Sequence, residues 1–423
     1  MNHHITNANI KEWARDYDGP QFDGILCDPP YELGFMGKSW DSSGIAFDKD
    51  MWADILKLLK PGGHLLAFSG SRTYHRMAVA IEDAGFEIRD QLIWMYGSGF
   101  PKSLNIGKAV DKIQGNEREI TGTISSQDIT SGGLVHKEYS RVDVEVTKGT
   151  SEWEGYGTAL KPAHEPCVLA RKPLDGTVAN NVLKHGTGGL NIDGTRVGTT
   201  GARFNGRKVD SDIYGKYGVA KPKEDYNMGR FPANLIHDGS DEVEAVFPQT
   251  GKSQVRKVKP TETLTKENTV FETSGYKTRI EGEVNDNGGS ASRYFYTAKA
   301  SKRERNAGLE GFEPQITNDG REKDIDNAFQ RGTTLRSNHH PTVKPLSLTK
   351  YLATLIKPPT GGRLLVPFSG SGSEMIGALQ AGWEYVEGVE LTEDYIPIAE
   401  ARIKHWLEQK AEEDNKPKQE SLL

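Results

Sequence analysis

The chain has 423 residues, enough for a sizeable core and about two structural units. It contains no run of 18 apolar residues, no secretory pattern at its start and only two cysteines, so we expect a cytoplasmic protein without a membrane span, disulfide framework or metal site. The net charge of −6 argues against a strongly basic surface along the whole chain.

The first hundred residues alternate between strand and helix patterns. The predicted strands are Phe22–Cys27, His64–Ser69 and Glu87–Tyr96, and the predicted helices are Met51–Leu59, stopped by Pro61-Gly62-Gly63, and Thr73–Ala84. This alternation predicts a parallel sheet covered by helices on both faces.

The first of these strands ends at Asp28-Pro29-Pro30-Tyr31. Neither proline can donate to a strand ladder, and the residue before each proline is held extended. We therefore expect a rigid corner that presents a carboxylate, a backbone carbonyl and an aromatic ring at the carboxyl edge of the sheet, where ligands bind in open α/β folds. Two acceptors beside a ring suit a planar substrate with an exocyclic amine. A turn that merely ends the strand is the alternative.

The middle of the chain changes character. Residues 111 to about 155 are rich in Ser, Thr, Gly and charge, which predicts an irregular insertion, and Glu165–Ala170 then reads as a strand. From 176 to 335 glycine and charge dominate, and this stretch is too long for one loop. Between Lys184 and Arg305, 21 Lys and Arg face 16 Asp and Glu, a mild basic excess that is compatible with a nucleic-acid-facing region.

The C-terminal part carries a second motif. Its predicted elements are a helix at Pro345–Ile356, a strand at Leu364–Val366, a turn at Pro367-Phe368-Ser369-Gly370-Ser371-Gly372-Ser373, a helix at Glu374–Ala381 and a strand at Tyr385–Val389 that ends at Glu390. Glycines in a strand-to-helix turn let the backbone approach a ligand closely, and an acid 18 positions after Gly372 suits a ribose diol. The next glycine, Gly377, is displaced from the dinucleotide pattern, which favours an adenosine-bearing cofactor other than NAD.

Together the two motifs resemble the S-adenosylmethionine-dependent DNA amino-methyltransferases, and their order is that of the permuted β class, which includes phage and prophage enzymes. Further segments that look like the family's are Gly34–Asp41, Lys161–Pro166, Asn191–Arg196, Gly229–Asn234 and His340–Pro345. One position departs from the pattern. The family usually has Asp before Pro-Phe in the turn, where this chain has Val366, so a hydrogen bond near the turn is absent or supplied elsewhere.

The resemblance implies a doubly wound, Rossmann-like α/β sheet with an inserted target-recognition region. Residues 1–175 would form the catalytic half, with the insertion 111–155, residues 176–335 the recognition region, and residues 336–423 the cofactor-binding half. The implied catalytic residues are Asp28, Pro29, Pro30 and Tyr31. The implied S-adenosylmethionine site comprises Asn9, Thr342, Lys344, Phe368, Ser369, Gly370, Ser371, Gly372, Ser373 and Glu390. For Lys344, an ordinary solvated lysine is the alternative.

The implied reaction is methylation of adenine N6 in a base flipped out of sequence-specific double-stranded DNA. Asp28 and the Pro29 carbonyl would accept both amine hydrogens and free the nitrogen lone pair, while Tyr31 stacks on the base. Cytosine-N4 methylation uses the same geometry and is the first alternative. Methylation of RNA or protein is disfavoured by Asp28 and by the long 176–335 segment, and Val366 leaves open a catalytically silent DNA-binding protein. A homodimer and a restriction endonuclease are open as further partners.

Overall fold

The computed structural model describes residues 2–33, 39–99, 103–129, 139–198, 203–204, 229–251, 282–283, 288–298, 301–317 and 334–415. The chain divides into two compact units. Unit 1 comprises Met1–Asn191, Asn234–Ser240 and Thr297–Leu423, and unit 2 comprises Ile192–Ala233 and Asp241–Tyr296. The Gly34–Lys38 part of the segment that resembles the family lies outside the described residues.

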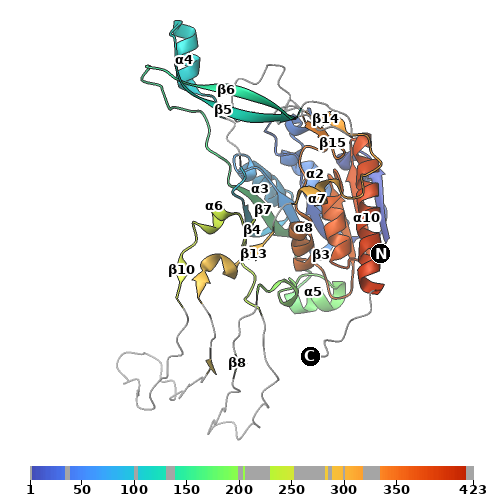
Figure 1. The fold of residues 1–423 in the computed structure, drawn as a ribbon. Helices are drawn as coiled ribbons and strands as arrows, with labels where there is room; N and C mark the ends of the chain where they lie inside the picture. The colour runs from blue at the N-terminus through green and yellow to red at the C-terminus, as the bar shows by residue number, and fades with distance from the viewer. Residues whose placement is uncertain are drawn as a thin grey trace, which may run out of the picture. The chain divides into compact units, whose positions relative to one another are not determined.

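The described part of unit 1 is built on a nine-stranded sheet with the strand order β1-β17-β16-β2-β3-β7-β4-β9-β13, of which only Tyr296 in β13 is assigned to unit 2. Figure 1 labels β3, β4, β7 and β13 of this sheet. The strands are β1 (Asn2–Asn7), β2 (Phe22–Cys27), β3 (Leu59–Phe68), β4 (Glu87–Met95), β7 (His164–Arg171), β9 (Leu235–His237), β13 (Tyr296–Thr297), β16 (Arg363–Pro367) and β17 (Tyr385–Glu390). β16 pairs in parallel with β2, with Leu364 opposite Gly24. Strands from the two ends of the sequence are therefore neighbours in the middle of one sheet, and their carboxyl ends share one edge.

Helices cover the sheet on both faces. The helices of unit 1 are α1 (Ile10–Asp16), α2 (Lys49–Leu58), α3 (Tyr74–Asp83), α4 (Ile106–Gln114), α5 (Val178–His185), α7 (Lys302–Asn306), α8 (Leu346–Leu355), α9 (Ser373–Gln380) and α10 (Ile396–Asn415). Ile25 of β2 belongs to the core cluster that includes Trp52 of α2. On the other face, a Cβ on Gly24 would lie 3.1 Å from Trp383 and 3.2 Å from Ile356.

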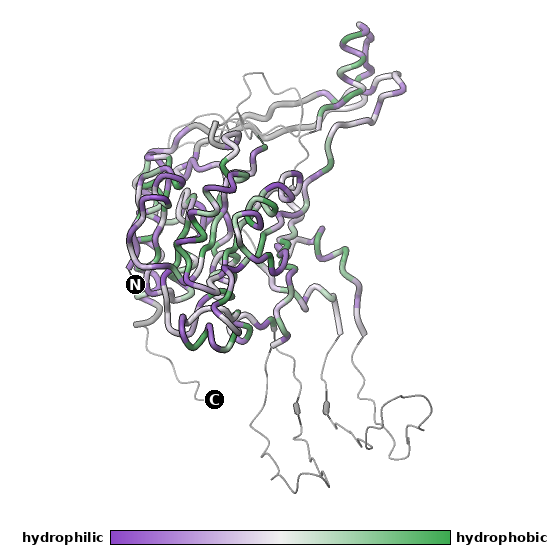
Figure 2. The backbone as a smooth tube through the Cα atoms, turned by 180° about the vertical axis from the view of Figure 1, so that it is seen from behind, coloured by the Kyte–Doolittle hydropathy of each residue, from purple (hydrophilic) through white to green (hydrophobic). Residues whose placement is uncertain are grey.

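Because alternate residues of a strand point to opposite faces, this double cover explains why all six residues of β2 are buried. Figure 2 shows hydrophobic stretches of backbone running through this unit. The predicted doubly wound α/β sheet is confirmed. None of the helices in the described part of the chain is both long and apolar enough to cross a lipid bilayer.

The sheet departs from the predicted parallel arrangement at β7. This strand lies between β3 and β4 and is antiparallel to both of them. The chain reaches β7 through α4 and a pair of strands rather than through a single crossover helix, and an antiparallel neighbour needs no crossover. The predicted stop at Pro61-Gly62-Gly63 also differs, because α2 ends at Leu58 and these residues lie inside β3.

The insertion 111–155 is more regular than expected. β5 (Glu119–Ile129) and β6 (Tyr139–Lys148) form an antiparallel two-stranded sheet with Glu119 opposite Lys148. In the sequence Val142, Val144 and Val146 alternate with charged and polar residues, which is the period of two typical of a strand. Because the segment as a whole is polar, its composition predicted an irregular insertion and this short strand pattern was not recognised.

Residues 176–335 contribute to both units, and part of this stretch lies outside the described residues. The helix α5, the strand β9 and the helix α7 belong to unit 1, as does the pair β14 (Gln315–Thr317) and β15 (Thr334–Arg336). The described elements of unit 2 are short: η4 (Asp193–Thr195), β8 (Arg203–Phe204), α6 (Asp241–Glu244), β10 (Gln249–Thr250), β11 (Gly282–Glu283), β12 (Gly289–Ser290) and η5 (Ala291–Tyr294).

Candidate active site

A pocket of about 1250 Å³ in unit 1 is lined by residues at the carboxyl ends of β2 and β16. The proline corner (Asp28–Tyr31) and the glycine loop (Phe368–Ser373) both line this pocket, although they come from opposite ends of the sequence. The volume exceeds the roughly 300–1,000 Å³ typical of a site for one small ligand. The pocket therefore has room for two ligands beside each other.

Most of the predicted site residues line this pocket: Asn9, Asp28, Pro29, Pro30, Tyr31, Thr342, Lys344, Phe368, Ser369, Gly370, Ser371, Ser373 and Glu390. Gly372 does not. It precedes α9 with φ of 80°, and a Cβ there would lie 3.2 Å from Cβ of Ala399. The left-handed backbone and the close approach of α10 explain the glycine at this position.

Hydrogen bonds to the backbone hold the proline corner in place. The Asp41 carboxylate accepts from the N–H groups of Glu32 at 3.0 Å and Leu33 at 3.2 Å. The Thr73 hydroxyl donates to the Tyr31 carbonyl at 2.8 Å. Glu32 has φ of 55°, a left-handed conformation that is costly for a residue with a side chain. These bonds stabilise the strained turn and fix where Asp28 lies.

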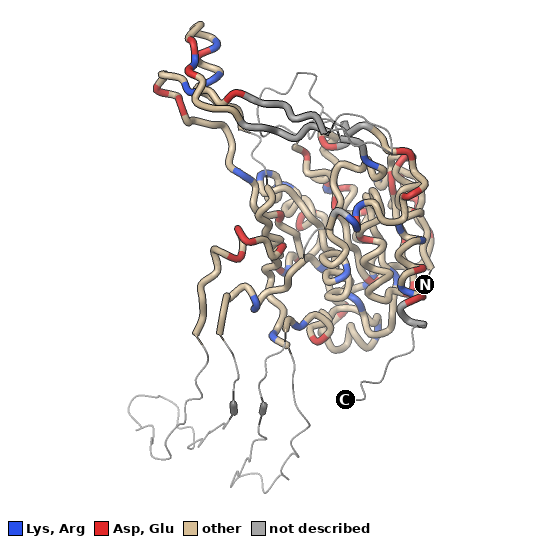
Figure 3. The backbone as a smooth tube through the Cα atoms, in the orientation of Figure 1, with Lys and Arg blue, Asp and Glu red and all other residues tan. Residues whose placement is uncertain are grey.

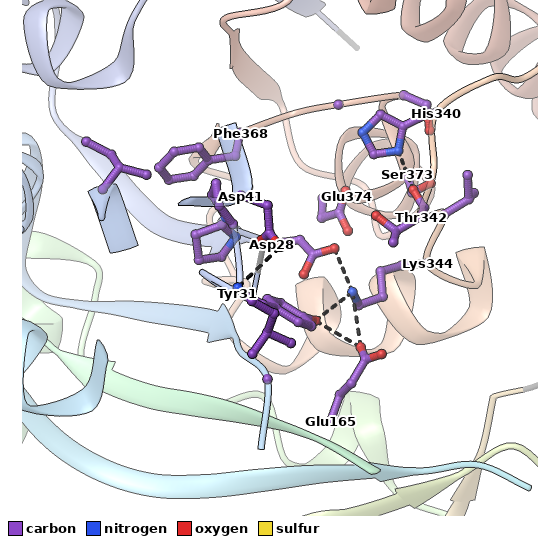
Figure 4. A pocket seen from close by; sticks show the side chains of 18 of the residues that line it. Asp28, Tyr31, Asp41, Glu165, His340, Thr342, Lys344, Phe368, Ser373 and Glu374 are labelled. Atoms are coloured by element: carbon purple, nitrogen blue, oxygen red, sulfur yellow. Dashed lines mark hydrogen bonds and ion pairs between the residues drawn. The ribbon is translucent and has the colours of Figure 1, made fainter. Parts of the chain in front are cut away.

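Lys344 connects the proline corner to the C-terminal half of the sheet (Figure 4). Its Nζ donates to Oδ2 of Asp28 at 2.6 Å and to the Tyr31 hydroxyl at 3.0 Å, and it lies 3.2 Å from Oε2 of Glu165. The Tyr31 hydroxyl donates to the same Glu165 oxygen at 2.9 Å. Lys344 is only 6% exposed, so it is not the solvated lysine of the alternative interpretation.

The charges of this cluster follow from burial and pairing. Burial alone would lower the pKa of Lys344, but the carboxylates of Asp28 and Glu165 outweigh it and raise that pKa above its ordinary value. Burial, followed by the same two carboxylates, raises the pKa of Tyr31 well above its usual range. The lysine is therefore a permanent cation at neutral pH, and the tyrosine is a neutral hydroxyl whose orientation is fixed.

The second oxygen of Asp28 is different. Oδ1 is buried, and among the described residues no donor bonds to it. A buried carboxylate oxygen without a donor costs free energy, and in a native protein it calls for an explanation. Because Asp28 lines the pocket, we expect this oxygen to accept from a ligand that carries an N–H or O–H group.

The glycine loop has an unusual backbone. Phe368 has φ of 59° and Gly370 has φ of 50°. Of the non-glycine residues in the described ranges, Phe368 and Glu32 alone have positive φ. Phe368 begins the glycine loop, and Glu32 directly follows the proline corner. A Cβ on Gly370 would lie 2.7 Å from Nε2 of His340, so only glycine fits there. Burial lowers the pKa of His340 to about 4, so this ring is neutral at pH 7.

Glu390 ties the loop to the end of β17. Its Oε2 accepts from the Gly370 N–H at 2.7 Å, and its Oε1 accepts from the Thr392 N–H at 2.8 Å. Burial raises its pKa, although these N–H groups favour the ionised form. A carboxylate has about four lone-pair sites, so a hydroxyl of a ligand can still bind.

Asn9 and Thr342 line the pocket while serving local roles. Oδ1 of Asn9 accepts from the Lys11 N–H at 3.0 Å and caps α1. The Thr342 carbonyl is bonded to Nδ1 of His340. These contacts position the two residues at the pocket. That either residue contacts a ligand stays a prediction.

Sequence analysis gave no site role to four polar residues near the pocket, although two of them lie in segments that resemble the family's: Glu165, His340, Glu374 and Arg402. Arg402 is completely buried and donates to the Ser371 carbonyl, to the Ser371 hydroxyl at 2.9 Å and to the Ser373 hydroxyl at 3.2 Å. Glu374 is a single carboxylate in the otherwise uncharged sequence of α9. For both Glu374 and Arg402, a charged residue on an otherwise apolar face of a helix was the sequence feature that could have identified them.

We expect the Arg402→Met variant to have a free energy of unfolding lower by about 2 kcal/mol, because the glycine loop loses the donors that bond its oxygens. Urea denaturation measures this loss. Arg15→Met is the control, because Arg15 is exposed and pairs only with the adjacent Asp16 in the described structure. Equal midpoints for the two variants would contradict the role of Arg402 in the loop.

Comparisons with known proteins bear on this pocket. Residues 22–189, which include β2, the proline corner and β7, match the DNA methylase family model of N6 and N4 methyltransferases. Type II methyltransferase M.HindIII of Haemophilus influenzae is 27% identical over 191 residues, which cover 44% of this chain and 50% of that protein. The chain thus spans about half the length of this curated relative. These sequence matches confirm the resemblance to the DNA amino-methyltransferases.

Solved structures were compared as well. The M1.HpyAVI–SAM complex is 13% identical, with 95% of this chain and 99% of that chain covered and a TM-score of 0.37. The cytosine-N4-specific PvuII DNA methyltransferase is 10% identical, with 95% and 86% covered and a TM-score of 0.41.

Proposed function

We propose that this chain, a relative of the DNA amino-methyltransferases, transfers a methyl group from S-adenosylmethionine to N6 of adenine in DNA. The observation that carries the proposal is the shared pocket. It joins an acceptor oxygen of Asp28 that has no donor in the described ranges to a glycine loop suited to a nucleoside cofactor. A DNA substrate would place the reaction in the cytoplasm of a bacterial or phage-infected cell.

The residues of the glycine loop fit this cofactor. Gly370 and Phe368 line the pocket in the turn between β16 and α9, and Glu390 stands at the tip of the next strand with lone pairs left for a ribose hydroxyl. Ser369 supports the same assignment, because its buried hydroxyl lines the pocket and is without a partner among the described residues. When bound, S-adenosylmethionine supplies an electrophilic methyl group on a sulfonium.

Asp28 would act on the amine of the target base. Lys344 holds one of its oxygens, which leaves Oδ1 to accept one amine hydrogen, and the Pro29 carbonyl would accept the other. Two acceptors draw the amine nitrogen toward tetrahedral geometry and release its lone pair from the ring. This stabilises the transition state more than the ground state. The nitrogen becomes cationic on methylation and then loses a proton, for which Asp28 is positioned.

Tyr31 would stack on the base. Its hydroxyl is held by Glu165 and Lys344, while the side chain as a whole is only partly buried at the pocket. A base inside a duplex cannot reach this corner, so the target nucleotide must be extruded. Lys and Arg residues are interspersed with Asp and Glu over the described backbone (Figure 3), so electrostatic attraction to DNA would come from local rather than overall charge.

Adenine is preferred over cytosine because the corner has Asp28, whereas the cytosine-N4 enzymes of the family more often have Ser there. The test is mass spectrometry of nucleosides from DNA incubated with the protein and methyl-labelled S-adenosylmethionine, with RNA in a parallel reaction. We expect labelled N6-methyladenine from DNA. Labelled N4-methylcytosine would change the base assignment, and label in RNA alone would overturn the substrate.

A further inference from the structure

Glu374 is a buried carboxylate that the mechanism above does not use. It lies in the first turn of α9, directly after the glycine loop, and is 4% exposed. It lines the same pocket as Asp28 and Lys344, and Figure 4 shows it beside them. Its Oε1 is buried and has no hydrogen-bond partner among the described residues. An uncompensated buried carboxylate oxygen is costly, and a ligand in the pocket can supply the missing donor.

The surroundings of Glu374 compensate its negative charge only in part. The ionisable groups that act on it most strongly are Asp28 at the end of β2, Lys344 ahead of α8 and Arg402 of α10. Lys344 already pairs with Asp28 and Glu165, and Arg402 bonds oxygens of the glycine loop. Burial, followed by the charge of Asp28, raises the pKa of Glu374 to about 7. A cationic donor in the pocket would favour the ionised carboxylate.

The position that the family resemblance assigns to an acid offers no such group. Val366 is fully buried in β16, opposite Gly388 of β17, and its side chain can accept no hydrogen bond. Val366 therefore cannot make the hydrogen bond that an acid would make at this position. Glu374, directly after the glycine loop, is a candidate to supply it instead.

We propose that Glu374 binds the α-ammonium group at the amino-acid end of the nucleoside cofactor, and so supplies the carboxylate that Val366 cannot. This inference rests on the proposed function. The ammonium is both cationic and a hydrogen-bond donor, which is what Oε1 lacks, whereas the sulfonium of the same cofactor has no N–H or O–H to donate. Glu374 also lies beside Asp28, where the methyl group is transferred, while Glu390 lies at the strand tip expected to face the ribose.

The test measures affinity by isothermal titration with three ligands. S-adenosylmethionine and S-adenosylhomocysteine both carry the ammonium, and 5′-methylthioadenosine lacks the amino-acid end. We expect Glu374→Gln to weaken the first two by about 10- to 100-fold, the effect of losing a charged hydrogen bond, and to leave the third unchanged. Glu393→Gln is the matched control, because Glu393 is exposed and does not line the pocket; it should bind all three ligands as the parent protein does.

A dependence on pH gives a second readout. Affinity of the parent protein for S-adenosylhomocysteine should fall as the pH is lowered from 8 to 6, because Glu374 becomes protonated and neutral, and this fall should be absent in Glu374→Gln. Of its neighbours, Lys344 stays charged through this range because its pKa is raised. His340 stays neutral because its pKa is about 4.

Three outcomes would overturn the inference. If Glu374→Gln weakened the binding of all three ligands equally, Glu374 would only support the loop. Weaker binding of S-adenosylmethionine alone would indicate a contact with the sulfonium. Unchanged binding of all three would exclude a contact. If the parent protein bound none of the ligands, the proposed function itself would fail. Thermal melting of Glu374→Gln verifies that the variant is folded.

Discussion

The Asp28→Ala variant is expected to lose methyl transfer by about 10²- to 10³-fold while still binding S-adenosylmethionine. The loss follows because Oδ1 of Asp28 is a buried acceptor at the pocket without a donor among the described residues, and removing a group that stabilises developing charge in a transition state costs rates of this order. Most of the proposed cofactor contacts, on the glycine loop and at Glu390, make no hydrogen bond to Asp28 among the described residues, so cofactor binding should persist. Single-turnover transfer of labelled methyl to DNA measures the rate, and isothermal titration measures cofactor binding.

Two further variants make this result interpretable. Asp28→Asn keeps an acceptor oxygen without the charge, so its rate should lie between those of the parent protein and Asp28→Ala. Asp48→Ala removes the cap of α2, where Asp48 accepts from the N–H groups of Asp50 and Met51. It should lower stability by about 1 kcal/mol without affecting transfer. If Asp28→Ala failed to fold, or transferred methyl groups at the parent rate, the proline corner would be structural only.

The two motifs that meet at the pocket were predictable because each is fixed by its own backbone chemistry. Consecutive prolines end β2 whatever surrounds them, and glycines at positions of positive φ shape the turn before α9. Their meeting followed from the doubly wound topology, in which the carboxyl ends of neighbouring strands share an edge. In the structure β16 pairs in parallel with β2, so the carboxyl ends of these two strands lie at the same edge of the sheet.

What sequence analysis could not predict depends on partners far along the chain. Whether Lys344 is solvated or buried is decided by Asp28, which lies 316 positions away, and by Glu165 on β7. The role of Glu374 could not be predicted for the same reason, because the sequence does not show whether a carboxylate on an apolar helix is exposed or buried. The antiparallel direction of β7 depends on its pairing with β3 and β4, and strand pairing is not encoded in the period of a single strand.

Removing the charge of Lys344 is the second change for which we expect a large effect. Lys344→Met leaves Asp28 and Glu165 without their shared cation, and breaking one side of a largely buried ion pair is strongly destabilising. We expect the free energy of unfolding to fall by about 3 kcal/mol and the rate of methyl transfer to fall by about 10²-fold, because Oδ2 of Asp28 loses the donor that orients it. Urea denaturation and single-turnover transfer measure the two losses.

The dependence on pH tests whether Lys344 keeps its charge near neutral pH. The pKa of Lys344 is raised in the folded protein, so its electrostatic contribution is complete below its ordinary pKa of 10.5 and is lost only as the pH rises above that value. The stability difference between Lys344→Met and the parent protein should therefore be constant from pH 7 to 9. A difference that shrank over this range would mean that the lysine is already losing its proton there.

A charge-balanced double variant separates stability from catalysis. Lys344→Met combined with Glu165→Gln removes one cation and one carboxylate from the cluster, so it should recover much of the stability lost in Lys344→Met. Transfer should not recover, because Oδ2 of Asp28 still lacks the Nζ donor. Glu165→Gln alone keeps that contact and serves as the matched control. Recovery of both properties in the double variant would show that Lys344 only balances charge, whereas recovery of stability alone would identify it as the residue that positions Asp28.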